Sequence, residues 1–202
     1  MMREARSLIA ELDATLARAP ESRRVAILRS VTSLYIGGLQ GFSDAHVAVF
    51  DDVFGRLIEK ASRPTLIEFS ARMAPLAPAP RNVIAQLASN DDITISGPLL
   101  EKCSELSEEN LAEIAATKHQ KYLAAIAGRA RIDVAVTDVL VDRANSDVVR
   151  KMTVNPGAAI SELGFVKLIG RAKTDKPLAE AIAGRSDVPP ELQPFLRLAL
   201  ET

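Results

Sequence analysis

The four residues Ile-Ala-Gly-Arg at positions 126–129 occur again at positions 182–185, and Val-Asn-Pro-Gly occupies positions 154–157 midway between them. The three phrases are therefore equally spaced, and we call the spacing from 126 to 154 the repeat interval. An apolar helix end followed by Gly or Asn at a regular interval is typical of a tandem array of short helical pairs. A looser copy, Leu-Ala-Ser-Asn at 87–90, precedes the first by more than this interval, so the period is imperfect. The repeat predicts a stack of helices.

The amino-acid composition also favours helices. Apolar residues make up 48% of the 202 positions, with only six Phe, two Tyr and no Trp. Closely packed helices are built from such a set, which Ala, Leu, Ile and Val dominate. We therefore expect an all-α protein, and more specifically a right-handed α-solenoid of short antiparallel helix pairs. We expect about ten to twelve helices.

In the N-terminal part, apolar residues at three- and four-residue steps predict helices at 3–19, 21–36 and 43–61, and a further helix opened by Pro64. The second of these should stop at Gly37 and Gly38. Three prolines within residues 75–80 are too dense for a helix and predict an extended connector. The predicted domains are 1–74 and 81–202, or one continuous solenoid that includes the connector.

In the C-terminal part, the same pattern predicts short helices at 81–88, from Gly97-Pro98, at 107–117, 122–126, 133–144, 147–154, 161–172 and 177–183, and from Pro190 to the end. Lys118 falls at an inward position, so either its stem snorkels to the surface or the helix breaks near Thr117, and the break is favoured. Each helix is shorter than an isolated stable helix, so stacking on neighbours must supply most of the stability.

Charge and cysteine content limit the function classes. The chain has 25 basic and 26 acidic residues, whereas nucleic-acid-binding domains are usually clearly basic. The single cysteine, Cys103, excludes an intramolecular disulfide and fits a reducing compartment. Charged residues throughout positions 1–19 argue against a signal peptide, and no segment is apolar enough for a membrane span. We expect a soluble, cytoplasmic protein that does not bind membranes, and for which nucleic acid is a less favoured partner than protein.

Few residues carry recognisable chemistry. His46 and His119 lack a metal-ligand partner at one-turn spacing, so we expect no metal. His119, within Lys-His-Gln-Lys at 118–121, faintly resembles the histidine of a phosphotransfer helix, although a plain surface histidine is the preferred interpretation. Cys103 is expected to be a buried, inert thiol. Nucleotide-binding and acyl-transfer motifs are missing, so we predict no catalytic residue and no cofactor.

The repeat itself supplies the structural candidates. Gly128, Asn155 and Gly184 are predicted to end helices in the left-handed conformation. Arg129 and Arg185 follow two of these turns. Either they form a ladder along one ridge of the stack, or each caps the carbonyl groups of its own helix.

A partner-binding surface follows from the ladder interpretation. Arg150 and Lys151 should project from the helix at 147–154, because the apolar residues beside them point inward. Together with Lys121, Arg129 and Arg185 they would form a mildly basic strip. Such a strip suits an acidic face of a protein partner.

The sequences at 87–91 (Leu-Ala-Ser-Asn-Asp), 126–129 and 154–161 (Val-Asn-Pro-Gly-Ala-Ala-Ile-Ser) resemble a bacterial family of uncharacterised proteins, a domain of unknown function, with HEAT-like or leucine-rich-repeat-variant helical arrays. The likeness extends from Arg81 to the C-terminus. It implies an α-solenoid and carries over no catalytic residue. Members of this kind are often longer, which leaves open whether the chain is one domain of a larger protein.

Three function classes remain. A non-enzymatic scaffold or adaptor that binds a protein partner is favoured, since a helical array without catalytic motifs offers chiefly an extended surface. The alternatives are a nucleic-acid-binding helical repeat and a signalling module that uses His119.

Overall fold

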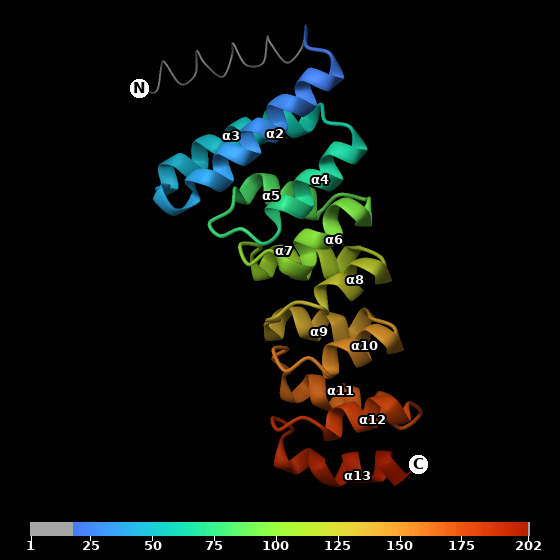
Figure 1. Cartoon of the computed structure of the whole chain (residues 1–202). Helices are drawn as coiled ribbons and strands as arrows, with labels where there is room; N and C mark the ends of the chain where they lie inside the picture. Colours follow the sequence, from blue (N-terminus) through green and yellow to red (C-terminus); the bar gives the residue numbers. More distant parts are fainter. Residues whose placement is uncertain (1–17, 202) are drawn as a thin grey trace. The chain divides into compact units, whose positions relative to one another are not determined.

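The computed structural model describes residues 18–201, and every regular element within that range is a helix (Figure 1). Twelve α-helices, α2 to α13, are joined by loops and two short 3-10 segments in this part of the chain. The prediction of an all-α protein is confirmed. The helix predicted at 3–19 lies outside the described residues except for its last two positions. None of the described helices is long and apolar enough to cross a membrane.

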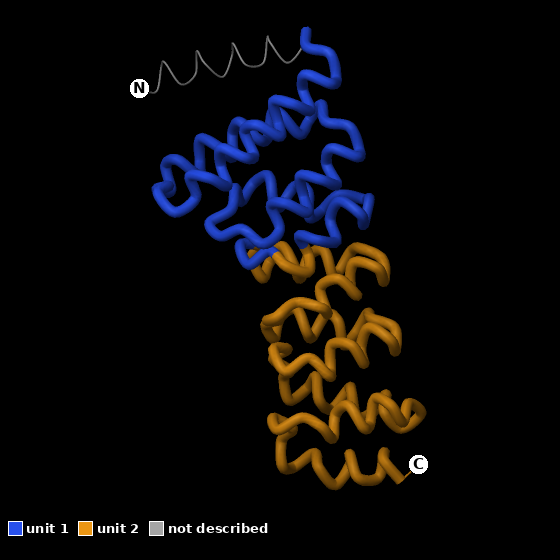
Figure 2. Tube along the Cα trace, in the orientation of Figure 1, with its two compact units in different colours: residues 1–99, 103–105 blue, residues 100–102, 106–202 orange. Residues whose placement is uncertain are grey.

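The chain divides into two compact units (Figure 2). The first comprises residues up to 99 together with 103–105, and the second comprises 100–102 and the residues from 106 onward. The proline-rich segment at 75–80, where the sequence predicts a boundary, lies inside the first unit. Tyr35 explains this difference, because its fully buried side chain donates a hydrogen bond from Oη to the carbonyl oxygen of Pro78 at 2.8 Å. The segment is non-helical as expected, but it packs on the core of its unit.

The first unit contains α2 (Glu21–Gly38), the 3-10 segment η1 (Leu39–Gly41), α3 (Asp44–Glu59), α4 (Arg63–Met73) and α5 (Arg81–Ala88). Helix α2 continues through Gly37 and Gly38, where a stop was predicted, and η1 makes the turn instead. The core of this unit holds an aromatic cluster whose ring centroids lie 5.0 to 5.9 Å apart: Tyr35, Phe42, Phe50, Phe54 and Phe69.

Asp51 is the one carboxylate on the buried face of α3. Its two oxygens accept hydrogen bonds from the backbone N–H groups of Asn82, at 3.0 Å, and Val83, at 2.9 Å. These groups lie in the first turn of α5, where N–H donors have no partner within the helix. The carboxylate therefore caps α5 from a different helix, and this contact compensates for its burial.

The second unit contains α7 (Glu108–Thr117), α8 (Gln120–Ile126), α9 (Val134–Arg143), α10 (Ser146–Thr153), α11 (Glu162–Ala172), α12 (Lys176–Ala183), the 3-10 segment η2 (Pro190–Leu192) and α13 (Gln193–Glu201). Helix α7 packs on α9, α9 on α11, and α11 on α13, while α8, α10 and α12 pack on one another in the same way. Figure 1 shows these two series side by side, from the yellow-green α7 to the red α13. The break predicted near Thr117 is present.

Local capping explains most of these helix starts. The side chains of Ser107, Asn145, Ser161 and Asp175 each accept a hydrogen bond from a backbone N–H in the first turn of α7, α10, α11 and α12. These are short polar residues immediately before an apolar pattern, which is the sequence signal for a helix start.

Helix α6 (Ile93–Lys102) departs from the prediction, since Gly97 and Pro98 lie inside it rather than at its start. The start is fixed earlier by Asp92, whose Oδ1 accepts hydrogen bonds from the backbone N–H and the hydroxyl of Thr94. Proline lacks the N–H that would bond to the carbonyl four residues earlier, so the helix tolerates the loss of one hydrogen bond there. The strong cap at Asp92 outweighs the preference of proline for a first turn.

The buried positions of α9 and α11 repeat in register. Val136, Leu140 and Ala144 are buried in or directly after α9, and the residues one repeat interval later, Gly164, Leu168 and Ala172, are buried in α11. The interval seen in the turns therefore also relates the buried positions of α9 and α11. Leu140 and Leu168 have no exposed surface.

The predicted left-handed turns are not formed. No described residue has a positive φ, and Gly184 has φ −73° and ψ −8°. Gly128, Asn155 and Gly184 do lie in the turns after α8, α10 and α12, but with right-handed or extended backbone. A left-handed residue at a helix end serves to pair the last carbonyl groups within the chain segment itself. Here side chains from the following repeat pair several of those carbonyls.

Candidate binding surface

Arginines link the helices of the α7, α9, α11 series. Nη1 of Arg143, in the last turn of α9, donates to the carbonyl oxygen of Ala115 in α7. Arg171, one repeat interval further on, occupies the equivalent place in α11 and donates to the carbonyl oxygens of Val141 and Ala144, both at 2.9 Å. The last four carbonyl groups of a helix have no partner within it and carry a partial negative charge. Each arginine therefore caps the preceding helix of its series.

The turns of the α8, α10, α12 series use a second set of side chains. Nη1 of Arg129 donates to the carbonyl oxygen of Leu100 at 2.7 Å. In the next turn Asn155 takes this role, and its Nδ2 donates to the carbonyl oxygen of Arg129 at 2.7 Å. In the turn after that, Arg185 donates to the carbonyl oxygens of Thr153 and Ala158. We call these contacts, together with those of Arg143 and Arg171, the capping ladder.

Two residues of the predicted basic strip belong to the capping ladder, and their side chains are buried. Arg129 is 8% exposed, as is the side chain of Arg185, and both point into the protein. They cap the preceding repeat, which matches neither of the two interpretations drawn from the sequence. Helical spacing in the sequence does not indicate this role, because the acceptors lie 27 to 32 residues away along the chain.

The other three residues of the predicted strip lie on the surface. Arg150 forms ion pairs with Asp147 and Asp175, and hydrogen bonding to Asp147 is the main cause of its raised pKa. The ammonium group of Lys151 donates to the carbonyl oxygen of Ala124 at 2.8 Å. Lys121 is exposed on α8. The strip is therefore broken into separate groups, most of them paired within the protein, and its role in binding stays a prediction.

The three residues considered for chemistry lie at helix starts or in the core. His46 accepts a hydrogen bond at Nδ1 from the backbone N–H of Ser43, at 3.1 Å, which helps to fix the start of α3. His119 is exposed at the N-cap of α8, and Cys103 is buried. Among the described residues, no three His, Cys, Asp or Glu side chains are grouped so that they could hold a metal ion.

An apolar surface that the sequence analysis did not single out lies on α11 and α13. Leu163 and Val166 are 61% and 50% exposed on α11, and Phe195 and Leu198 are 57% and 63% exposed on α13. Leu198 stands one repeat interval after Gly170, which lies one turn beyond Val166 on the same face of α11. Since α11 packs on α13, the two helices continue one surface. We call these four apolar residues the lateral patch.

The sequence contains a signal for the lateral patch. In the repeat register, Leu163 and Val166 correspond to Ala135 and Asp138, whose neighbours Val136 and Thr137 are the buried ones. Leu163 and Val166 are therefore apolar at positions that the repeat leaves outside the core. Recognising them requires the register to be applied position by position, whereas helical periodicity alone counts them as core.

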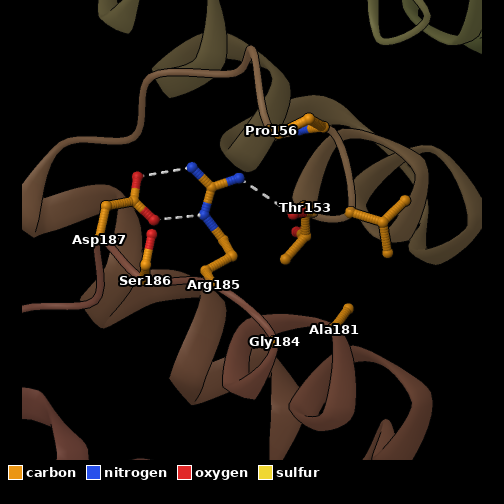
Figure 3. Close-up of a pocket in the computed structure, with 8 residues that line it drawn as sticks. Thr153, Pro156, Ala181, Gly184, Arg185, Ser186 and Asp187 are labelled. Atoms are coloured by element: carbon orange, nitrogen blue, oxygen red, sulfur yellow. Dashed lines mark hydrogen bonds and ion pairs between the residues drawn. The ribbon is translucent and has the colours of Figure 1, made fainter.

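A pocket of about 370 Å³ lies between the turns that follow α10 and α12 (Figure 3). Arg185 crosses it and forms a paired contact with the carboxylate of Asp187, with Nε to Oδ1 at 2.8 Å and Nη2 to Oδ2 at 2.6 Å. Hydrogen bonding to Arg185 is the main reason that the pKa of Asp187 lies below its usual value. The remaining lining residues are Thr153, Val154, Pro156, Ala181, Gly184 and Ser186.

Residues 95–196, about half of the chain and most of its second unit, match a family described as "Uncharacterised protein conserved in bacteria (DUF2336)". No curated protein and no solved structure matches the chain.

Proposed function

We propose that this chain, which belongs to the bacterial DUF2336 family, is a non-enzymatic scaffold or adaptor that binds a protein partner through an extended helical surface. Its second unit would be a right-handed, HEAT-like α-solenoid. Support comes from the two series of helices, the matching buried positions of α9 and α11, and the capping ladder between successive turns. In such arrays each repeat contacts its neighbours, and the outer faces remain available for binding.

The lateral patch is the observation that carries the binding proposal. Four large apolar side chains at least half exposed on two adjoining helices are costly to leave in water, and grouped exposure of this kind marks interaction sites. Isolated exposed apolar residues carry no such meaning, so the adjacency of α11 and α13 is essential to the inference.

The polarity of α13 supports a specific lateral site. Gln193 and Arg197 stand one repeat interval after Phe165 and Ile169, which are buried in α11, yet both are exposed on α13. Polar residues thus occupy the positions where a further helix of the series would need apolar ones. The apolar residues of α13 that do remain exposed, Phe195 and Leu198, stand one repeat interval after Lys167 and Gly170, which are not buried in α11.

Affinity capture from a bacterial lysate tests this proposal. The double variant Val166→Glu with Phe195→Glu places two charges on the lateral patch, and Leu34→Glu, at a 65% exposed site in the first unit, is the matched control. We expect the double variant to bind a protein captured by the wild-type chain at least tenfold more weakly, a loss of about 1.4 kcal/mol in binding free energy. The control should bind it with unchanged affinity. All three chains should unfold within about 0.5 kcal/mol of one another, because the substituted sites are exposed.

Two results would count against the proposal. One is a set of captured proteins that is unchanged by the double variant. The other is capture of nucleic acid with a steep dependence on salt, which would favour the nucleic-acid alternative. The near-zero net charge and the use of Arg129, Arg143, Arg171 and Arg185 inside the fold support a protein partner over nucleic acid.

A further inference from the structure

The pocket beside Arg185 is open because a long side chain that covers the turn in one repeat is replaced by a short one in the next. In α10, Lys151 stands one residue before the buried Met152 and reaches over Gly128 of the preceding turn. A Cβ atom on Gly128 would lie 2.7 Å from the Lys151 ammonium nitrogen. In the α8, α10, α12 series the structurally equivalent residues follow the buried Ile126, Met152 and Ile182 and not the repeat interval. The residue of α12 that corresponds to Lys151 is therefore Ala181, and Val154 occupies the place of Gly128. No long side chain covers the second turn, and Val154 is left 65% exposed.

Hydrogen bonding inside the pocket restricts the ligands it can take. A guanidinium group has five N–H donors. All five of Arg185 are used, by the carbonyl oxygens of Thr153, Asn155 and Ala158 and by both oxygens of Asp187. The arginine therefore has no donor left with which to hold an anion, although an anion would be the obvious guess for a pocket that contains it.

The polar side chains that remain at the pocket can all accept a hydrogen bond. Each carboxylate oxygen of Asp187 accepts one hydrogen bond and has capacity for another, and the carboxylate side chain is 48% exposed. The hydroxyl of Ser186 lies next to it at the pocket (Figure 3). Apolar lining comes from Val154, Pro156 and Ala181. A fitting ligand would carry a hydrogen-bond donor at the end of a short apolar stem.

We infer that this pocket binds an alkylammonium group, namely a lysine side chain presented by the protein partner. The stem would pack along Val154 and Ala181, and the ammonium group would donate to Asp187 and Ser186. Lysine buries its methylene stem on apolar surface in this way while its charge stays near water. Within the protein, Lys151 already lies across the preceding turn and donates to the carbonyl oxygen of Ala124.

This inference rests on the proposed function for the identity of the ligand, and the experiment separates the two. The probe is Nα-acetyl-lysine N-methylamide, added to the isotope-labelled chain while the methyl signals of Val154 and Ala181 are followed by NMR. We expect saturable shifts at both methyl groups. The Nε-acetylated probe, which keeps the stem and loses the charge, should bind at least tenfold more weakly.

Two substitutions complete the test. Ala181→Lys supplies a side chain that occupies the pocket from within and should abolish the shifts of the Val154 methyl groups, whereas Ala183→Lys, at an exposed position outside the pocket lining, should leave them intact. Equal binding of the two probes, or shifts that survive Ala181→Lys, would overturn the inference. Stronger binding of a free diamine than of the lysine probe would overturn the assignment to a protein partner. Probe binding that persists in the Val166→Glu, Phe195→Glu chain would show that the pocket acts independently of the lateral patch.

Discussion

Nη2 of Arg171 donates a hydrogen bond to the carbonyl oxygen of Ala144 at 2.9 Å, which joins the end of α11 to the end of α9. The two residues are 27 positions apart and occupy successive repeats. Side-chain donors of Arg143, Asn155 and Arg185 likewise reach carbonyl groups of the preceding repeat. Successive repeats are therefore held by directed hydrogen bonds to helix ends and the turns after them, as well as by apolar packing. Charged donors make such bonds stronger than those between neutral groups.

Removing a member of the capping ladder should destabilise the protein. For Arg171→Met, which keeps most of the stem, we expect a loss of about 1–3 kcal/mol in the free energy of unfolding, because two carbonyl groups lose their charged donor. Urea unfolding followed by circular dichroism measures it. Arg197→Met, at an exposed position of α13, is the control and should change the free energy of unfolding by less than about 0.5 kcal/mol. Equal effects at the two sites would contradict the capping role of Arg171.

Asn155 offers a way to separate donor from acceptor. Its Nδ2 donates to the carbonyl oxygen of Arg129, and its Oδ1 accepts from the backbone N–H of Gly157 at 2.9 Å. Asn155→Asp retains the acceptor, removes the donor and places a negative charge beside a carbonyl oxygen. We therefore expect Asn155→Asp to cost at least as much as Asn155→Ala, about 1–2 kcal/mol by chemical denaturation. If Asn155→Asp left the free energy of unfolding unchanged, the Nδ2 donor would contribute nothing to stability.

Alanine substitutions at two glycines should change the stability of the protein in opposite directions. Residues Ile132 and Ala158 form an isolated parallel bridge, and a Cβ atom on Gly157 would lie 1.9 Å from the backbone oxygen of Ala130. Gly157→Ala should therefore cost about 1–3 kcal/mol or more, since rigid backbone must move. Around Gly170, inside α11, nothing lies within 4 Å of an added Cβ, so Gly170→Ala should stabilise the protein by about 0.5–1 kcal/mol. Thermal unfolding of both variants checks the signs, and destabilisation by Gly170→Ala would refute the second.

Tyr35 should make the protein sensitive to alkali. Burial, followed by the charges of Glu105 and Asp51, raises the pKa of Tyr35 to about 12. An unfolded tyrosine has a pKa of about 10, so the folded state holds the proton more tightly. The stabilising effect of the neutral phenol is complete below about pH 10 and is lost as the pH rises towards 12.

Ultraviolet absorbance of the phenolate checks this prediction against the other tyrosine, Tyr122. In the wild-type chain, ionisation of one tyrosine should coincide with alkaline unfolding. Tyr35→Phe should remove that part of the pH dependence, although it also removes the hydrogen bond to Pro78. A Tyr35 that ionises near pH 10 in the folded protein would be incompatible with its burial.

Helix positions in the second unit could be predicted because their signals are local. Ser107, Asn145 and Ser161 each cap the helix that directly follows, and the donor and acceptor lie only three residues apart. Asp92 acts locally too, but Pro98 indicated a competing helix start. Sequence patterns do not give the relative strength of these two start signals. The choice depended on hydrogen bonds that Asp92 makes within its own turn.

The candidate site was less predictable for a physical reason. Arg129 and Arg185 were recognised as repeated residues, yet their side chains serve carbonyl groups about one repeat away, and no spacing rule within a helix points to those acceptors. The lateral patch likewise becomes a surface only when α11 and α13 adjoin.

The sequence by itself determined that this chain is helical, where most of its helices begin and at what interval they recur, because propensity, capping and apolar period act over about one helical turn. Tertiary structure alone decided which repeat each arginine caps and that the turns between the described helices need no left-handed glycine. It also decided which apolar residues remain exposed. Those outcomes depend on groups that are distant in the chain and meet only when the helices stack, so their energies cannot be assigned to any single stretch of sequence.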